Sequence, residues 1–232
     1  MTRTSAGPVV RYIRLAEERR CGPMLRGLLD DDERDRMRRL PTAALRENYA
    51  LVHGRVRMVL AEFCDVDPVE LHYSLGPRGK PETVAPAAAV GVHWNLSTSG
   101  DWALLGISPG RPVGVDLELV RVRPAAVPSL ARYFPRSDRE EIAAVSPAER
   151  PRAYHRTWVR KEAWAKARGL GVIHALRHPV AEMRANEPGG RVCDIDAPDG
   201  YVAAVCLESD GREAPSAASS FDLSAAIASP SR

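Results

Sequence analysis

The sequence predicts an α+β fold with two similar halves. The prediction rests on the order of the expected elements. A strand, helices and short strands occupy the first half, and helices and strands follow again in the second. The length of 232 residues allows a full hydrophobic core, in one large domain or two small ones. No internal sequence repeat accompanies the two halves.

The composition is that of an ordinary globular protein, with 44% apolar and 27% charged residues. No apolar run approaches the roughly 18 residues of a membrane span. We expect no signal peptide, because the first residues lead directly into a strand-like segment. The four scattered cysteines form no Cys-x-x-Cys pair, which argues against zinc or a disulfide framework. We therefore expect a reduced, cytoplasmic protein, and a net charge of +3 is too small for bulk nucleic-acid binding.

The first half is expected to begin with a strand at residues 9–15. An acid-rich turn at residues 30–33 offers N-cap groups for a short helix toward Leu40. A longer helix is predicted from Pro41 onward, because its apolar residues recur every three or four positions and form one buried stripe. That stripe consists of Leu45, Tyr49, Val52, Val56, Val59 and Phe63.

Short strands are expected after residue 69. Residues 76–81 form a loop, because two glycines and two prolines cannot lie inside a regular element. An antiparallel meander is then predicted around residues 90–120. Its strands are residues 90–96, 102–107 and 113–120, with turns at residues 97–101 and 108–112.

The second half begins with a proline-rich linker around residues 123–128. Ser137 is expected to cap a helix, with Glu140 at the third helical position. A stronger helix is predicted from Pro151 to Arg168, closed by a glycine-rich turn. Two late strands follow, at residues 190–196 and 201–207. Residues 209–232 are rich in Ala, Ser and Pro and are expected to form a mobile tail.

Asp116 and Glu118 form a pair of acids on a predicted strand. Side chains two positions apart on a strand project to the same face. Two carboxylates this close repel each other unless a cation or a proton intervenes, and Mg²⁺ prefers oxygen ligands. The alternative is a half-exposed edge strand with two solvated acids, and for the pair alone this alternative is favoured.

Glu162 and Lys166 lie four residues apart on the strong helix and so share one side of it. As an ordinary surface pair they would contribute only a few tenths of a kcal/mol. However, a carboxylate and two lysines, Lys161 and Lys166, crowd a helix that ends in a glycine-rich turn. That combination suits a phosphate and its metal.

Lysine is rare in this chain. Of 33 basic residues only three are lysines, namely Lys80, Lys161 and Lys166, which leaves 30 arginines. A lysine kept in such a background suggests a site that needs a compact point charge rather than a planar fork, although all three could also be exposed and arbitrary. Lys80 lies in the loop at residues 76–81. The hydroxyls at residues 97–99 follow a strand, as in an anion site, but each of these signals is weak alone.

Together these segments resemble the signature of the 4′-phosphopantetheinyl transferases. The resemblance is carried by Gly-Val-Asp-Leu-Glu at residues 114–118, by Trp-Val-Arg-Lys-Glu-Ala at residues 158–163, and by Lys166. It extends to the loop at residues 79–81, the turn at residues 95–97 and the helix carrying Arg46 and Arg55. It covers roughly residues 9–207 and is closest to the larger, single-chain, two-lobed (surfactin-synthetase-activating) type.

The resemblance implies two α/β lobes, residues 1–112 and 113–208, related by pseudo-twofold symmetry with the active site in the cleft between them. It also implies an enzyme that transfers 4′-phosphopantetheine from coenzyme A to a serine of an apo acyl or peptidyl carrier protein, releasing adenosine 3′,5′-bisphosphate. The expected partners are carrier domains of polyketide, nonribosomal peptide or fatty-acid synthases. We expect a monomer that binds neither nucleic acid nor membrane.

The resemblance also assigns roles to individual residues. The implied ligands of Mg²⁺, with Mn²⁺ as the alternative metal, are Asp116, Glu118 and Glu162. The implied contacts to coenzyme A are Arg46, Arg78, Lys80, Ser97, Thr98, Lys161 and Lys166. Thr98 stands where this type usually has histidine, so a hydroxyl replaces a group that can carry positive charge.

The implied catalytic residues are Asp116, Glu162 and Lys166. Lys166 would stabilise the developing negative charge, and Glu162 would accept the serine proton, directly or through a water. A metal-bound water is the alternative proton acceptor. Two other functions remain open: a different Mg²⁺-dependent enzyme that handles a nucleotide, and a non-catalytic relative that binds coenzyme A or carrier proteins.

Overall fold

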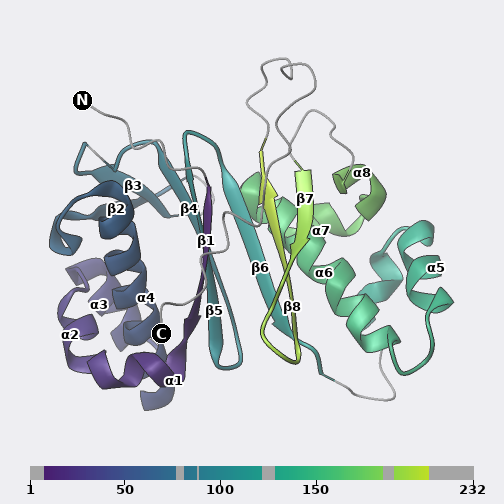
Figure 1. The fold of residues 1–232 in the computed structure, drawn as a ribbon, viewed down its shortest axis with the longest axis horizontal. Helices are drawn as coiled ribbons and strands as arrows, with labels where there is room; N and C mark the ends of the chain where they lie inside the picture. Colours follow the sequence, from purple (N-terminus) through teal and green to yellow (C-terminus); the bar gives the residue numbers. More distant parts are fainter. Residues whose placement is uncertain (1–7, 77–80, 88, 122–128, 185–190, 209–232) are drawn as a thin grey trace.

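The computed structural model describes residues 8–76, 81–87, 89–121, 129–184 and 191–208 (Figure 1). The predicted linker at residues 123–128, the predicted tail at residues 209–232, and Arg78 and Lys80 lie outside the described residues. Among the described helices, none is both long enough and apolar enough to span a bilayer.

The first half of the chain contributes helices followed by short strands. Its elements are β1 (Val9–Arg14), α1 (Leu15–Glu18), η1 (Arg19–Cys21), α2 (Gly22–Gly27), α3 (Asp31–Arg38), α4 (Ala43–Cys64), η2 (Pro68–Glu70), β2 (His72–Leu75), β3 (Pro81–Ala85), β4 (Val92–Ser99) and β5 (Trp102–Pro109). The predicted helix starts are confirmed, because Asp30 and Glu33 form a capping box before α3 and Thr42 caps α4.

The described part of the second half begins with a strand, continues with helices of which α6 is the longest, and ends with two strands. Its elements are β6 (Val113–Leu119), η3 (Ser129–Tyr133), α5 (Arg136–Ala144), α6 (Arg150–Ala167), α7 (Val172–Leu176), α8 (Val180–Arg184), β7 (Arg191–Ile195) and β8 (Tyr201–Leu207). The predicted cap at Ser137 is wrong: α5 begins at Arg136 after Pro135, so Ser137 lies inside the first turn.

The strands form two antiparallel three-stranded sheets, in the orders β1-β5-β4 and β6-β8-β7, and a β2-β3 pair. The predicted meander is therefore half right. β4 and β5 pair as expected, but β6 belongs to the second sheet, because β1 and β4 already occupy both edges of β5. The predicted turn at residues 97–101 is also shorter than expected: Ser99 still belongs to β4, and only Gly100 and Asp101 form the turn.

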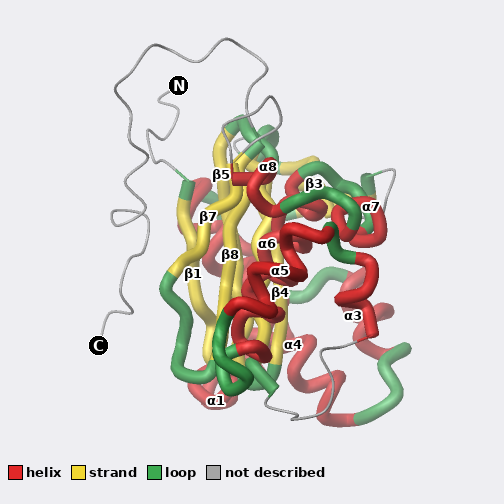
Figure 2. The backbone as a smooth tube through the Cα atoms, turned by 90° about the vertical axis from the view of Figure 1, so that its right-hand side faces the viewer, coloured by secondary structure: helices red, strands yellow, loops and turns green. Residues whose placement is uncertain are grey.

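One long helix covers each sheet. In Figure 1, α4 lies beside the first sheet and α6 beside the second, and Figure 2 shows α6 lying across the strands. Buried apolar residues of α4 and β5 form one core, and those of α6 and β8 form another. A third cluster joins the two sheets, with Leu104 of β5 packed among Val115 and Leu117 of β6. The predicted pseudo-twofold relation between two lobes, and the boundary after residue 112, stay predictions.

The buried face of α4 is wider than the predicted stripe. Leu45 in its first turn is 46% exposed, whereas Leu51, Gly54 and Arg57 are buried. The reason is a close contact with α2, because a Cβ built at Gly54 would lie 2.3 Å from the backbone oxygen of Leu25. Glycine at this position therefore lets α2 cover a second side of α4.

Candidate active site

β4 and β6 lie side by side, and side chains rather than a backbone ladder join them. Three polar side chains of β4 accept hydrogen bonds from backbone N–H groups of β6. The pairs are Asn95 Oδ1 with Val115 N at 2.9 Å, Ser97 Oγ with Leu117 N at 3.3 Å, and Ser99 Oγ with Leu119 N at 3.0 Å. The paired numbers rise together, so the strands run parallel. We call this set of three hydrogen bonds the β4–β6 seam.

Gly114 brings α6 directly onto β6. A Cβ at this position would lie 2.1 Å from the backbone oxygen of Ala163 and 2.3 Å from the backbone nitrogen of Ala167. Only glycine leaves room for this approach. The neighbours of those two alanines, Glu162 and Lys166, are thereby held next to the acids of β6.

Asp116 lies where the seam meets α6 and is 3% exposed. Its Oδ1 accepts hydrogen bonds from Ser97 Oγ and from Lys166 Nζ, each at 2.7 Å. Its Oδ2 is buried without a hydrogen-bond partner among the described residues. Burial raises the pKa of Asp116 above its ordinary value, although the charge and hydrogen bond of Lys166 and the Ser97 hydrogen bond lower it in part.

Glu118 lies two residues along β6 on the same face. Its Oε2 accepts a hydrogen bond from Ser99 Oγ at 2.9 Å. Burial raises the pKa of Glu118, the Ser99 hydrogen bond lowers it, and the negative charge of Asp116 raises it again. The neighbouring His155 and Lys166 lower the pKa of Glu118 by smaller amounts.

Glu162 faces both acids from α6. Burial, followed by the charges of Asp116 and Glu118, raises the pKa of Glu162 to about 7, although Lys166 lowers it in part. The three predicted ligands therefore lie within electrostatic reach of one another. The structure brings them together from one strand and one helix, with Lys166 among them.

This donor set suits a hard divalent cation. Three carboxylates share one nearby lysine, and an oxygen of Asp116 lacks a partner among the described residues, so negative charge is under-compensated. Mg²⁺ takes carboxylate oxygens as ligands. In the described part of the chain, no three His, Cys, Asp or Glu side chains are arranged as a metal site, and Lys166 contacts Asp116. The assignment of Asp116, Glu118 and Glu162 as metal ligands stays a prediction.

Lys161 is not part of this cluster. It is fully buried, its Nζ lies 2.7 Å from Asp138 Oδ2, and it donates to the backbone carbonyl of His178. It also lies over the ring of Phe134. Two side chains that are five residues apart on an α-helix project to different sides of it. Lys161 therefore points into the interior, while Lys166 points to Asp116. In this conformation Lys161 cannot contact a phosphate, and its role is to join α5 to α6.

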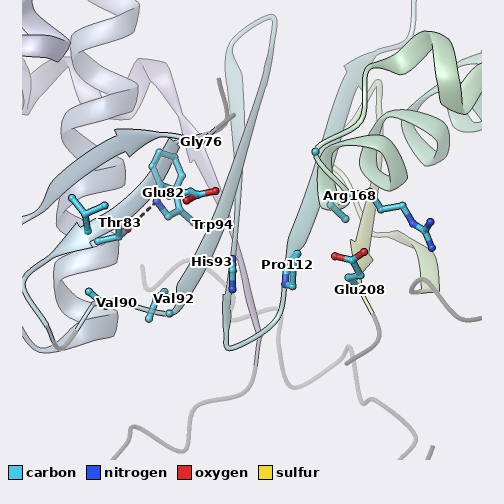
Figure 3. A pocket seen from close by; sticks show the side chains of 14 residues that line it. Gly76, Glu82, Thr83, Val90, Val92, His93, Trp94, Pro112, Arg168 and Glu208 are labelled. Carbon is cyan, nitrogen blue, oxygen red and sulfur yellow. Dashed lines mark hydrogen bonds between the residues drawn. The ribbon is translucent and has the colours of Figure 1, made fainter. Parts of the chain in front are cut away.

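A cavity of about 700 Å³ is lined by residues of β3 and β4 and by residues at the C-terminal end of α6 (Figure 3). Figure 3 shows β4 with His93 and Trp94 on one side and Pro112, Arg168 and Glu208 on the other. The remaining residues that line the cavity are Gly76, Glu82, Thr83, Val84, Val90, Gly91, Val92, Ala167 and Gly169. The volume is typical of a small-molecule site. The carboxylates do not line the cavity, but it reaches Ala167, the neighbour of Lys166.

The other predicted coenzyme contacts are more scattered. Arg46 lies at the start of α4, donates to the backbone oxygen of Leu40 at 2.7 Å, and is not among the cavity-lining residues. Thr98 is exposed and alternates with the two serines of β4, so it projects to the other face of the strand. Arg78 and Lys80 lie outside the described residues.

Sequence reasoning missed the roles of Ser99 and Gly114. A signal for Ser99 was present, because the spacing of the two serines equals the spacing of the two acids, with one pair on each strand. No local signal showed that these strands are neighbours. Gly114 belonged to the recognised motif. The reason for a glycine at this position is the close contact with α6, which depends on packing.

Comparisons with known proteins show which family this chain resembles. Residues 112–206 match the model of the 4′-phosphopantetheinyl transferase superfamily. The 4′-phosphopantetheinyl transferase HetI of Nostoc sp. is 26% identical over 81% of this chain and 81% of the relative. The protein slr0495 of Synechocystis sp., provisionally named as such a transferase, is 26% identical over 69% of this chain. The 4′-phosphopantetheinyl transferase psf-1 of Bacillus pumilus is 30% identical over 62% of this chain.

The chain spans just under two thirds of the slr0495 and psf-1 sequences, namely 65% and 59% of their lengths. The family match covers β6, α6 and β8, which carry Asp116, Glu118, Glu162 and Lys166 or pack against them. Residues 112–206 are thus similar to the 4′-phosphopantetheinyl transferase superfamily, and the relatives named here carry the name of such transferases.

Proposed function

We propose that this protein transfers the 4′-phosphopantetheine group of coenzyme A to a serine of an apo carrier protein and releases adenosine 3′,5′-bisphosphate. The observation that carries the proposal is the buried contact of Lys166 with Asp116, with Glu118 and Glu162 in electrostatic reach. Phosphoryl-type transfer needs positive charge and oriented groups around a diphosphate. The family match and the names of the relatives support this reaction class.

Asp116, Glu118 and Glu162 are the proposed ligands of Mg²⁺, with Mn²⁺ as the alternative. A bound Mg²⁺ would neutralise charge on the diphosphate of coenzyme A and so favour departure of the leaving group. The Oδ2 of Asp116, which lacks a hydrogen-bond partner among the described residues, and the raised pKa of each of the three carboxylates support this assignment.

Lys166 is proposed to contact the phosphate oxygens of coenzyme A. Its side chain is 28% exposed, so the ammonium can reach a ligand while Asp116 holds it at 2.7 Å. A fixed positive charge at this point would stabilise the negative charge that develops on the leaving oxygen.

Glu162 is proposed to accept the proton of the carrier serine, directly or through a water. A general base works best when its pKa lies near the working pH, and burial among acids raises the pKa of Glu162 to about 7. An ordinary glutamate would be a much weaker base.

The cavity beside Ala167 is the proposed site for the nucleotide end of coenzyme A. It adjoins Lys166 along α6, and Arg168 supplies a cation at its wall. Arg46, Arg78, Lys80 and Thr98 are proposed as further contacts at that end of the coenzyme. The proposed partners are carrier domains of secondary-metabolite or fatty-acid synthases, with the protein acting as a cytoplasmic monomer.

The test incubates the purified chain with coenzyme A, Mg²⁺ and an apo carrier domain, followed by mass spectrometry of the carrier. We expect the carrier to gain the mass of one phosphopantetheine group, and Asp116→Asn to abolish the gain while remaining folded by circular dichroism. Cleavage of coenzyme A without carrier modification would support a different Mg²⁺-dependent enzyme. Binding of coenzyme A or carrier without transfer would support a non-catalytic relative.

A further inference from the structure

We propose that Ser97 and Ser99 are a pair of positioning residues, whose hydroxyls are oriented by the backbone of β6 so that they hold Asp116 and Glu118 in place for the cation. The inference rests on the proposed function, because it concerns the same carboxylates. It assigns a role to the β4–β6 seam that neither the family match nor the names of the relatives contain.

The direction of the two hydroxyl protons follows from the seam. A serine hydroxyl has one proton to donate and two lone pairs that accept. The amides of Leu117 and Leu119 donate to Ser97 Oγ and Ser99 Oγ and so occupy a lone pair on each oxygen. Each hydroxyl proton is then directed to the carboxylate beside it, at 2.7 Å for Ser97 and 2.9 Å for Ser99.

The seam is well placed to keep this geometry. Ser97 is only 7% exposed, so water competes little for its hydroxyl. Lys166 Nζ also lies 3.3 Å from Ser97 Oγ, which ties α6 to the same oxygen. The N–H groups of β6 would lack these partners without the two hydroxyls, and unpaired buried backbone groups are strongly disfavoured. The backbone therefore holds the serines, and the serines hold the acids.

The register of the two strands couples both contacts. Side chains recur every second residue on a strand, so two serines and two acids with equal spacing meet pairwise when the strands run parallel. A slip by one residue would turn both hydroxyls away from the carboxylates. The two serines of β4 therefore have the same spacing along their strand as Asp116 and Glu118 have along β6.

Asn95 provides a matched control within the same seam. Its Oδ1 accepts from Val115 N at 2.9 Å, as the serines do from their amides. The residue of β6 beside it is Gly114, which has no carboxylate to hold. Removing the Asn95 side chain breaks a seam hydrogen bond but leaves both serine–carboxylate contacts intact.

The test measures Mn²⁺ binding to the purified full chain by electron paramagnetic resonance, beside thermal unfolding. Residues that orient metal ligands typically change metal affinity by about 10–100-fold. We expect Ser99→Ala to weaken Mn²⁺ binding at least about tenfold, Ser97→Ala to weaken it similarly, and Ser99→Thr, which keeps the hydroxyl, to restore it. Asn95→Ala should lower the melting temperature while leaving Mn²⁺ affinity within about twofold of the parent, because it breaks only a neutral hydrogen bond.

Two results would overturn the proposal. One such result is that Ser97→Ala and Ser99→Ala bind Mn²⁺ as the parent does, while Glu118→Ala binds it weakly. That result would support the metal site and contradict the positioning role of the serines. If Asn95→Ala weakens binding as much as Ser99→Ala, the seam supports the site only by general stability. A parent chain that binds no Mn²⁺ would instead remove the proposed metal site, and the positioning role with it.

Discussion

Two of the clusters of buried charge in the described residues, one around Arg57 and one around Lys166, differ in how well they are balanced. In the first half, Arg57 is buried between two acids: it donates to Glu33 at 2.6 Å and to Asp30. It also donates to the backbone oxygens of Pro68 and Leu71. In the second half, Lys166 faces three acids rather than two. Counted as formal charges, one cation and two acids sum to −1 in the first cluster, whereas one cation and three acids sum to −2 in the second.

The pKa values of the acids follow this balance. Burial alone would raise the pKa of Glu33, but hydrogen bonds and charges from His53 and Arg57 lower it below the ordinary value. The acids around Lys166 instead have raised pKa values. In a structural cluster, neighbouring protein groups compensate the charge of the acids. In a cluster that binds a charged ligand, the ligand supplies part of that compensation. The predictions below test this difference.

The largest effect is expected for Glu162→Gln in the second cluster. Loss of a general base typically costs about 10²–10⁴ in rate, so carrier modification should fall by about that factor. The free energy of unfolding should stay unchanged or rise, since one of three crowded acids is neutralised. Carrier mass spectrometry and urea unfolding of the same preparation check both parts. A variant that modifies the carrier at the parent rate would remove Glu162 from the reaction.

Arg57→Met should be the most damaging change to stability. It leaves Asp30 and Glu33 buried without their cation, and breaking a buried pair in this way costs about 3–5 kcal/mol. Urea unfolding gives the value, with Arg34→Met, at a partly exposed arginine paired with Asp31, as the control for loss of an arginine. A loss below about 1 kcal/mol, the size found for exposed pairs, would show that the first cluster is not a structural anchor.

Two glycine substitutions separate stability from function. In Gly114→Ala and Gly54→Ala alike, the new Cβ meets the backbone of a packed helix. Overpacking of this kind costs about 1–3 kcal/mol, so both variants should unfold at lower urea concentration. Gly114→Ala should also weaken Mn²⁺ binding, because it displaces α6 from the acids, whereas Gly54→Ala should not. Equal Mn²⁺ affinity in both variants would contradict the role given to Gly114.

The smallest effect concerns the pH dependence of stability. The pKa of Glu33 is lowered in the folded state, so its contribution is present above the unfolded pKa near 4.5 and is lost as the pH falls through the folded value. Glu162, with a pKa raised to about 7, has the opposite sign and destabilises the fold as the pH rises from 4.5 toward 7. Urea unfolding in metal-free buffer should therefore show a shallower acid loss for Glu33→Gln and a smaller decline toward pH 7 for Glu162→Gln. Profiles identical to the parent would contradict both assignments.

The starts of α3 and α4 and the end of α6 were predictable because their signals are local, whereas the predicted cap of α5 was wrong. The Asp30–Glu33 capping box, the Thr42 cap and the glycine-rich end of α6 lie within a few residues of the structure they determine. The sheet to which β6 belongs was not predictable from local signals. The partner strand β8 lies some 90 residues away, with Val113 opposite Leu207, and nothing near residue 113 shows that β5 has no free edge.

Buried cations show the same limit. Arg57 resembles any other residue of an arginine-rich chain, and only the packing of α3, η2 and β2 around it makes it an anchor. The rarity of lysine drew attention to Lys161, which the structure places in a buried ion pair with Asp138 rather than beside Asp116. A compact ammonium suits a buried ion pair with Asp138 as well as a phosphate site.

The sequence by itself determined which side chains share a face: Asp116 with Glu118 on a strand, and Glu162 with Lys166 on a helix. Those periods follow from backbone geometry and need no partner. Only the tertiary structure decided that the two faces meet, that Gly114 lets them meet closely, and that Ser97 and Ser99 reach the acids from a strand outside the predicted pairing. Contacts between distant segments arise from packing, which leaves no periodic trace in a single sequence.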